Sequence, residues 1–325
     1  MLALLLPAGC RSEEPPPAVL EKGICEIPKD ESALRQVCEK QRKTAATLLP
    51  DRREEEIGAY VGESCAVLVR CLSYGKEREK VTCYVADVFI DDMSQFCGYV
   101  CRDENGRLTK TPAEEVAEKT DALLLINADF LSARSWGLYV RGGEKVRDKG
   151  LGGFDLCLVD SDGKMTVTDS DGTTVKEIME RKDLYHVFSF GPSLLNGDGT
   201  PRDEDSDFHI TDRYSKWNNY ESSVGFPVPN PRTAVGQAAD GHFIFMTVDG
   251  RMRGFSRGVT FPELSHMMYE EGASVAYNMD GGGSEIMIFR GKELTKQYSE
   301  DAKRIPGDYI CIFTAPVDPL SDEKG

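Results

Sequence analysis

Apolar and polar positions along the chain predict a protein built mostly of β-strands. Residues 62–74 and 80–90 alternate or run apolar with many β-branched side chains, which is typical of paired strands. The segments 123–126, 242–248 and 286–289 are short apolar runs near turn residues, as expected of buried strands. The fold class that these patterns indicate is α+β, mostly strands with a few covering helices.

A few segments show helical spacing instead. Apolar residues recur at helical intervals within 31–49, and 111–121 is a helix-like run in which Thr111 is the expected cap and a proline follows it. Residues 260–263 (TFPE) form a capping box, which predicts a helix over 261–271 that ends at a glycine.

The segment 278–285 (NMDGGGSE) places three glycines, Gly281, Gly282 and Gly283, directly after an acidic residue. Glycine adopts positive φ and lets another group approach the main chain closely. Apolar runs on both sides predict that the glycines form the turn of a β-hairpin. Favourable turn chemistry by itself also accounts for an isolated Asp-Gly-Gly, so the polar residues around the glycines carry the functional signal.

Two predicted strands end in the same polar pair. Asn127 and Asp129 follow the apolar run within 121–130, and Asn278 and Asp280 follow the run before the glycines. Side chains alternate along a strand, so both members of each pair lie on one face at the strand end. We therefore expect four polar side chains to meet at one place.

Further candidate residues extend this set. Asp249 closes the strand at 242–248, and Arg232 and Arg251 stand in an arginine-rich stretch of an acidic chain. A planar guanidinium suits phosphate oxygens, although ordinary pairing with surface carboxylates also explains such arginines. Ser284 follows the glycines, but GGGS is neither a phosphate-binding loop nor a nucleophile elbow.

These carboxylates suit two kinds of chemistry. Asp129, Asp249, Asp280 and Glu285 can supply an acid, a base or a nucleophile, as in glycoside hydrolysis. Asp and Asn oxygens can instead hold calcium. The four histidines show no metal-ligand spacing, so no cofactor other than calcium is predicted.

Composition limits the classes of partner. The chain has 325 residues, of which 39 are Lys or Arg and 55 are Asp or Glu, and its net charge is −16. This charge repels nucleic acid and anionic membrane surfaces at long range, so nucleic acid is not an expected partner. With 40% apolar residues the chain can build a large core.

The N-terminal sequence MLALLLPAGCRSEEPPP resembles the end of a bacterial lipoprotein signal. A basic region is missing before the apolar run, and Pro7 departs from the usual pattern. In this interpretation Cys10 carries the lipid, and the protein is exported and anchored to the outer face of a bacterial cytoplasmic membrane. The other nine cysteines form no C-x-x-C pair. Export would permit one or more disulfides among Cys25, Cys38, Cys65, Cys71, Cys97 and Cys101.

Several motifs, in order along the chain, resemble the phosphodiester glycosidase family. They are INADF (126–130), GLYVRGGEKV (137–146), FSFGPSLLNGDG (188–199), RTAVGQ (232–237), FIFMTVDGR (243–251) with GVTFPELSHMM (258–268), and AYNMDGGGSEIMIFRGK (276–292). Ala128, Leu131 and Glu285 depart from the family pattern, which bears on substrate preference more than on reaction class.

The resemblance implies a hydrolase that cleaves a sugar-1-phosphodiester, at the bond between sugar and phosphate, on an extracellular or cell-envelope glycan. The phosphate leaves as a good anion, so an arginine suffices to stabilise it. Arg232 is expected to hold the phosphate, and Asp280 and Asp129, with Asp249 in addition, are the expected catalytic carboxylates. The remaining substrate contacts are expected from Arg251, Asn127, Asn278, Gly281, Gly282, Gly283 and Ser284.

The expected organisation has four parts: a signal remnant with a Pro-rich tether (1–22), a helical and strand region (23–79), the glycosidase-like domain (80–315) and a polar tail (316–325). The acidic segment 200–222 is either a lid over the site or a disordered insert.

Two other classes use the same residues. A catalytically silent binder of carbohydrate or phosphoglycan would keep the arginine and lack turnover. A calcium-stabilised structural module would keep the aspartates and respond to chelator. Turnover and glycan retention, measured with and without chelator, separate the three classes.

Cys10→Ala tests the predicted anchor. Expressed behind a complete export signal, the wild type is expected in the membrane fraction and the variant in the soluble fraction, because the lipid on Cys10 is the predicted attachment. Fractionation and immunoblotting measure the distribution, and Cys25→Ala is the matched control that should stay with the membranes. Wild-type protein found soluble in the cytoplasm would contradict the export interpretation.

Overall fold

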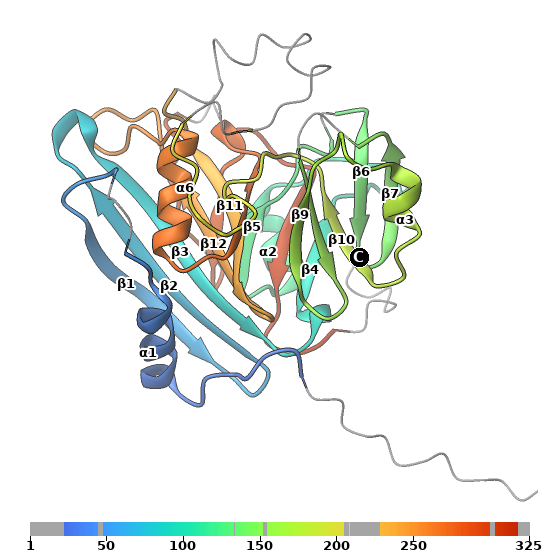
Figure 1. Cartoon of the computed structure of the whole chain (residues 1–325), viewed down its shortest axis with the longest axis horizontal. Coiled ribbons are helices and arrows are strands. Elements are labelled where there is room, and N and C mark those ends of the chain that lie inside the picture. The colour runs from blue at the N-terminus through green and yellow to red at the C-terminus, as the bar shows by residue number, and fades with distance from the viewer. Residues whose placement is uncertain are drawn as a thin grey trace, which may run out of the picture.

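The computed structural model describes residues 23–44, 48–132, 134–151, 155–204, 208, 228–299 and 303–317. In these residues the strands form three antiparallel sheets, and helices lie on the outer faces of the sheets (Figure 1). The α+β class predicted from the sequence is therefore confirmed. The helices are α1 (Glu31–Gln41), α2 (Ala113–Thr120), α3 (Val175–Met179) and α6 (Phe261–Glu270), with 3-10 turns η1 (Glu77–Glu79), η2 (Met93–Gln95) and η4 (Gly282–Ser284).

The largest sheet has six strands and includes the two strands that lead to the glycine segment. Its order is β1 (Arg53–Val61), β2 (Cys65–Tyr74), β3 (Val81–Ile90), β12 (His242–Val248), β11 (Arg232–Ala239) and β13 (Val275–Met279). The predicted pairing of 62–74 with 80–90 is confirmed by β2 and β3. This pairing also means that the region 23–79 shares a sheet with the expected domain from residue 80.

Two five-stranded sheets complete the fold. The first has the order β15 (Lys292–Glu293), β14 (Met287–Phe289), β5 (Leu124–Asn127), β16 (Asp308–Ile312) and β4 (Phe96–Val100). The second has the order β7 (Glu144–Lys149), β6 (Gly137–Arg141), β10 (Leu184–Phe188), β8 (Leu156–Asp160) and β9 (Met165–Thr168).

One hydrophobic core joins the three sheets. Val67, Ile126 and Phe188, which come from different sheets, belong to the same buried cluster. Every residue of β3 and of β12 is buried. The middle of the six-stranded sheet is therefore covered on both faces, which explains why these strands read as continuous apolar runs in the sequence.

Helices bury the remaining apolar faces. Phe261 and Leu264 of α6 pack on the six-stranded sheet, and Leu34 of α1 packs near the other end of that sheet. Val116 of α2 covers the first five-stranded sheet, and Ile178 of the short α3 covers the second (Figure 1). Each helix thus presents its apolar side to a sheet.

The prediction that the three glycines form a hairpin turn is wrong. β13, before them, pairs with β11 in the six-stranded sheet, whereas β14, after them, pairs with β5 in the first five-stranded sheet. The segment Gly281–Gly283 therefore carries the chain from one sheet to another. Short apolar runs on both sides of a turn cannot distinguish these two arrangements, because pairing partners are distant in sequence.

Two predicted helices also need correction. The helix expected over 31–49 ends at Gln41. α2 begins after Pro112 without a side-chain cap, so Thr111 is not its cap, and the Thr111 carbonyl instead accepts a hydrogen bond from Tyr309. The capping box at 260–263 is confirmed, because the side chain and backbone hydrogen bonds are made in both directions.

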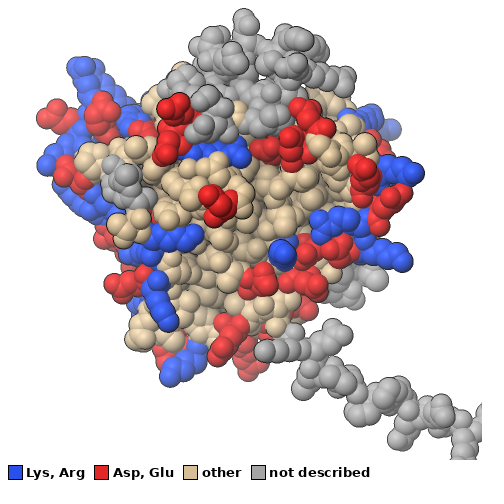
Figure 2. All heavy atoms as spheres, viewed as in Figure 1, with Lys and Arg blue, Asp and Glu red and all other residues tan. Residues whose placement is uncertain are grey.

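None of the nine described cysteines is bonded to another. Across the described residues, no helix is long and apolar enough to cross a membrane. The predictions for Cys10, for 1–22 and for most of 200–222 and 316–325 fall outside the described residues. On the face in Figure 2, acidic and basic side chains both border a largely uncharged central area, so the negative charge is not gathered in one block there.

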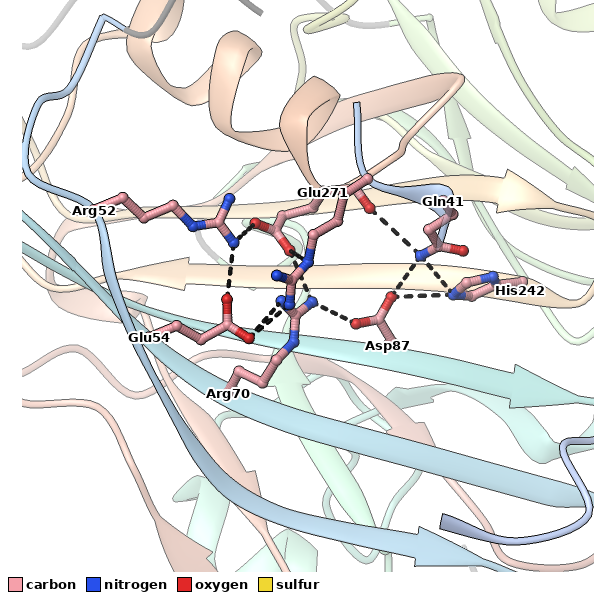
Figure 3. A network of polar contacts seen from close by, with 8 residues as sticks. Gln41, Arg52, Glu54, Arg70, Asp87, His242 and Glu271 are labelled. Carbon is pink, nitrogen blue, oxygen red and sulfur yellow. Dashed lines mark hydrogen bonds and ion pairs between the residues drawn. The ribbon is translucent and has the colours of Figure 1, made fainter. Parts of the chain in front are cut away.

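An ion-pair network fixes α1 and the end of α6 to the six-stranded sheet (Figure 3). At its centre the buried Arg70 places Nη2 at 2.6 Å from Asp87 Oδ2 and 2.8 Å from Glu271 Oε2. Gln41, the last residue of α1, donates to Asp87 Oδ1 at 2.8 Å, and His242 Nε2 lies 3.1 Å from the same oxygen. The Arg70 guanidinium therefore bridges two fully buried carboxylates, and Arg52, 2.6 Å from Glu271 Oε1, supplies a second positive charge.

Arg70→Met tests this network. The substitution leaves the buried Asp87 without its arginine and leaves Glu271 with Arg52 and Arg42, so we expect a loss of about 3–5 kcal/mol in the free energy of unfolding. Urea denaturation measures the loss, and Arg35→Met, which removes an exposed arginine paired with Glu31 and Glu56, should change stability little. A stability loss no greater than that of the control would show that the network does not hold the helices.

Candidate active site

The two Asn-x-Asp strand ends lie side by side. Asn127 Nδ2 donates to the carbonyl of Asp280 at 2.5 Å, and the N–H of Asp280 donates to the carbonyl of Ala128 at 3.1 Å. The end of β5 and the end of β13 are therefore joined, although they belong to different sheets. The four polar side chains nevertheless face different partners.

Gly282 lies between two arginines. Its φ is +64°, which favours glycine. A β-carbon built on Gly282 would lie 3.5 Å from Arg304 Nη2 and 3.6 Å from Arg251 Nη2. The bare backbone of the glycine thus allows two guanidinium groups to converge on one point.

Asp280 is the carboxylate next to these arginines. Its oxygens lie 3.1 Å and 3.4 Å from Arg304 Nη2, which also donates to the carbonyl of Gly281 at 2.6 Å. Arg304 Nε donates to Ser284 Oγ at 3.0 Å. Burial raises the pKa of Asp280, while the positive charge of Arg304 and the hydrogen bond of Ser284 oppose the rise.

Arg251 is held from one side by Asn230. Arg251 Nε and Nη2 donate to Asn230 Oδ1 at 3.1 Å and 2.8 Å, and Nη1 donates to the hydroxyl of Tyr298 at 3.4 Å. Arg251 is exposed and has a φ of +62°, a conformation that non-glycine residues adopt rarely. These contacts point its guanidinium at the glycine segment.

Arg232 is in a different setting from the other two arginines. It is buried, and its guanidinium carbon lies 4.0 Å from the centre of the Phe261 ring. Its nitrogens donate to the carbonyls of Val259 and Val228, both at 3.3 Å. Its backbone approaches the glycines, because a β-carbon on Gly281 would lie 3.2 Å from the Arg232 Cα.

Asp129 forms a buried ion pair away from the glycines. Its Oδ2 accepts from Arg141 at 2.7 Å and its Oδ1 from the N–H of Ser189 at 3.0 Å. Arg141 Nη2 also lies 2.9 Å from Asp308 Oδ2. Burial raises the pKa of Asp129 and brings that of Asp308 to about 7, although Arg141 lowers both.

The remaining predicted residues lie around this centre. Asn278 donates from Nδ2 to the carbonyl of Gly191 at 2.7 Å. Asp249, two residues before Arg251 in the sequence, is fully buried, and its Oδ1 accepts from the N–H of Lys296 at 2.8 Å. The structure thus brings Asp280, Gly281–Gly283, Ser284 and Arg251 together, and the Asn127 side chain holds the Asp280 backbone. The side chains of Arg232, Asp129, Asn278 and Asp249 make contacts elsewhere.

Two arginines at the site were missed by the sequence analysis. Arg304 lies about 20 residues beyond the glycines in a polar segment that carries no motif. Arg134 packs its guanidinium over Trp136 and Phe190, and its charge lowers the pKa of both Asp129 and Asp280. Neither position has a local pattern that separates it from a surface arginine.

A small pocket adjoins the glycines on the side of α2. Gly283, Ser284, Gln297, Lys303 and Arg304 are among its lining residues. Within the described part of the chain, no group of three or more His, Cys, Asp or Glu side chains has the arrangement of a metal site. The calcium expectation therefore stays a prediction.

The described residues define a mostly β domain of three sheets with a carboxylate and two arginines at a glycine turn. A family model described as phosphodiester glycosidase matches residues 120–313, which is more than half of the chain. The chain therefore belongs to the phosphodiester glycosidase family. The matched range includes β5, the glycine segment and Arg304.

A curated relative comes from Bacillus subtilis (strain 168). It is the SPbeta prophage-derived uncharacterized protein YomE, which is 27% identical to this chain over 239 residues. The match covers 72% of this chain and 33% of YomE, so the chain spans about a third of the length of that relative.

Solved structures share the fold. The catalytic domain of zebrafish N-acetylglucosamine-1-phosphodiester alpha-N-acetylglucosaminidase, auto-inhibited by its pro-peptide, superimposes with a TM-score of 0.62 at 17% identity over 80% of this chain and 87% of that one. A hypothetical protein from Synechocystis gives a TM-score of 0.53 at 11% identity, covering 76% and 62% of the two chains. A putative exported protein from Burkholderia pseudomallei gives 0.50 at 12% identity, covering 83% and 99%.

Proposed function

We propose that this chain is a hydrolase that cleaves a sugar-1-phosphodiester between the sugar and the phosphate. The observation that carries the proposal is the convergence of Arg251 and Arg304 over Gly282, next to the buried carboxylate of Asp280. Membership of the phosphodiester glycosidase family supports the reaction class. The glycan is expected to lie outside the cell or in its envelope, in keeping with the lipoprotein-like N-terminus.

The arginines suit the phosphate of such a substrate. A phosphodiester carries one negative charge and its monoester product carries more, so guanidinium groups stabilise the leaving group increasingly as the bond breaks. Arg251 and Arg304 can approach opposite sides of the phosphate because Gly282 has no side chain between them. In this proposal they take the role that the sequence suggested for Arg232.

Asp280 suits the attack on the sugar. A phosphate leaving group needs little protonation, so one carboxylate that attacks the anomeric carbon or deprotonates water is sufficient. Asp280 is 5% exposed and contacts Arg304. Arg304 would in turn bind the phosphate and so bring it next to the carboxylate. Asp129 lies in the neighbouring Arg141 ion pair, and we assign it to positioning the strand end rather than to attack.

Asp280→Asn tests the carboxylate. The substitution keeps the shape and removes the charge, so turnover of a sugar-1-phosphodiester should fall on the order of a hundredfold or more while the substrate still binds. Steady-state kinetics and calorimetric titration measure the two effects. Asp148→Asn, in which the lost carboxylate is exposed on β7, is the matched control and should keep wild-type turnover.

Near-normal turnover in a folded Asp280→Asn protein would remove Asp280 from catalysis. If the wild type binds the glycan phosphodiester without turnover, the chain is a phosphoglycan binder and the enzymatic proposal is wrong.

Reaction in ¹⁸O water tests which bond breaks. If a carboxylate or water attacks the anomeric carbon, the phosphate leaves with all its oxygens and carries no label. Attack at phosphorus would place the label in the phosphate product. We expect unlabelled phosphate by mass spectrometry, because the described site offers a carboxylate and arginines and no paired-metal set. Labelled phosphate would overturn the mechanism and leave the hydrolase assignment intact.

A further inference from the structure

Two acidic side chains, Asp249 and Glu285, are buried without an ion-pair partner among the described residues, although the charge of Lys296 lowers the pKa of Asp249. Asp249 is 0% exposed and Glu285 is 1% exposed. Both carboxylate oxygens of Glu285 and Oδ2 of Asp249 lack a hydrogen-bond partner among the described residues. Only Asp249 Oδ1 is satisfied, by the N–H of Lys296. Unpartnered ionised carboxylates in a protein interior are strongly unfavourable, so this arrangement requires a physical explanation.

The chain connects each acid to one side of the candidate active site. Glu285 directly follows Ser284, and its N–H donates to the carbonyl of Gly282 at 3.4 Å. Asp249 precedes Arg251 by two residues, and Arg251 reaches over Gly282. A change in the separation of the two carboxylates would therefore move Gly282 relative to Arg251.

The groups around the pair do not supply a buried cation. The neighbouring titratable and charged side chains are Glu293, Lys296, Lys303, Glu114, Tyr84 and Cys71. Lys303 is already paired, with its Nζ 2.8 Å from Glu114 and 3.3 Å from Glu293. Lys296 is exposed and places Nζ over the ring of Phe255. Glu293 adds a like charge, which makes double ionisation of the pair still less favourable.

We propose that Asp249 and Glu285 form a positioning pair that keeps the glycine segment against Arg251 while at least one of the two is protonated, and that loosens the segment when both ionise. Only the expected effect on kcat rests on the proposed function. The expected effects on stability and on the glycine segment do not depend on it. The adjacent residues Lys296 and Gln297 hold the two acids, through the Lys296 N–H to Asp249 Oδ1 at 2.8 Å and through Gln297 Nε2 to the Glu285 carbonyl at 2.6 Å. Mutual repulsion of two buried charges would therefore act against these two contacts.

The pKa values of the pair agree with this geometry. Burial raises the pKa of Asp249 to about 7, and burial with the nearby Asp249 charge raises the pKa of Glu285 well above its usual range. Both carboxyls titrate near pH 4 when the chain is unfolded, so the folded state holds more protons between about pH 4 and pH 7. Stability linked to this pair therefore falls as the pH rises through that window.

Glu285→Gln is the test variant. The amide has the same shape, cannot ionise and can donate to Asp249, so the pair loses its repulsion. We expect the melting temperature of the variant to exceed that of the wild type at pH 8 and to match it at pH 4.5. The alkaline limb of the kcat profile should move upward by about one pH unit or more, the usual scale of pKa perturbation in folded proteins. Asp249→Asn should give the same shifts, and the double variant should add little to either.

Glu104→Gln, at an exposed carboxylate, is the matched control and should leave both profiles unchanged. Hydrogen exchange of the Gly281–Glu285 amides, measured without substrate, separates this proposal from the proposed function. Exchange that accelerates with pH beyond the intrinsic rate in the wild type, and not in Glu285→Gln, supports the pair even if no phosphodiester is turned over.

Two results would overturn the proposal. One is a Glu285→Gln variant that loses stability equally at all pH values, which would make Glu285 a packing residue. The other is wild-type stabilisation by added calcium that the variant lacks, because the buried charges would then be neutralised by a cation instead of a proton.

Discussion

The side-chain amide of Asn127 is the interaction on which the site depends. Its Nδ2 donates to the carbonyl of Asp280, and its Oδ1 accepts from Thr233 Oγ1 at 2.8 Å and from the N–H of Ile286 at 3.2 Å. One buried side chain thus connects β5 with β11 of another sheet and with both ends of the glycine segment. Loss of this amide would leave several buried polar groups unsatisfied at once, which is more costly than the loss of one hydrogen bond.

Among the described residues, several buried acids are paired with arginine. Arg70 serves Asp87 and Glu271, and Arg141 serves Asp129 and Asp308. In each case one terminal nitrogen, Nη2, contacts both carboxylates through its two N–H groups. Asp249 and Glu285 have no such cation among the described residues. Unpaired buried acids are therefore not the rule in this protein. We take the exception at Asp249 and Glu285 as support for a local role at the glycine segment.

Local signals in the sequence predicted local structure well. The capping box at 260–263 specified the start of α6, and the paired apolar runs specified β2 and β3, because each signal involves residues close in sequence. The path of Gly281–Gly283 between two sheets depends on partners up to about 150 residues away, so the same local pattern predicted a hairpin. Arg304 and the Arg141 partner of Asp129 were missed for the same reason.

The net charge of −16 opposes the approach of an anionic substrate, whereas the two arginines over Gly282 favour its binding. At physiological ionic strength, charges more than about 8 Å apart are largely screened in solvent, so the surface acids affect approach more than binding. Within that distance Asp280 is the carboxylate that contacts Arg304, and Arg251 is held by a neutral amide, Asn230. Arg304 is therefore shared with Asp280, the proposed nucleophile. Arg251 contacts a neutral amide and keeps its full positive charge for the proposed phosphate. Because Arg251 is not paired with an acid among the described residues, a protein of net charge −16 can still offer a positively charged group at this site. The net charge alone would not have predicted this.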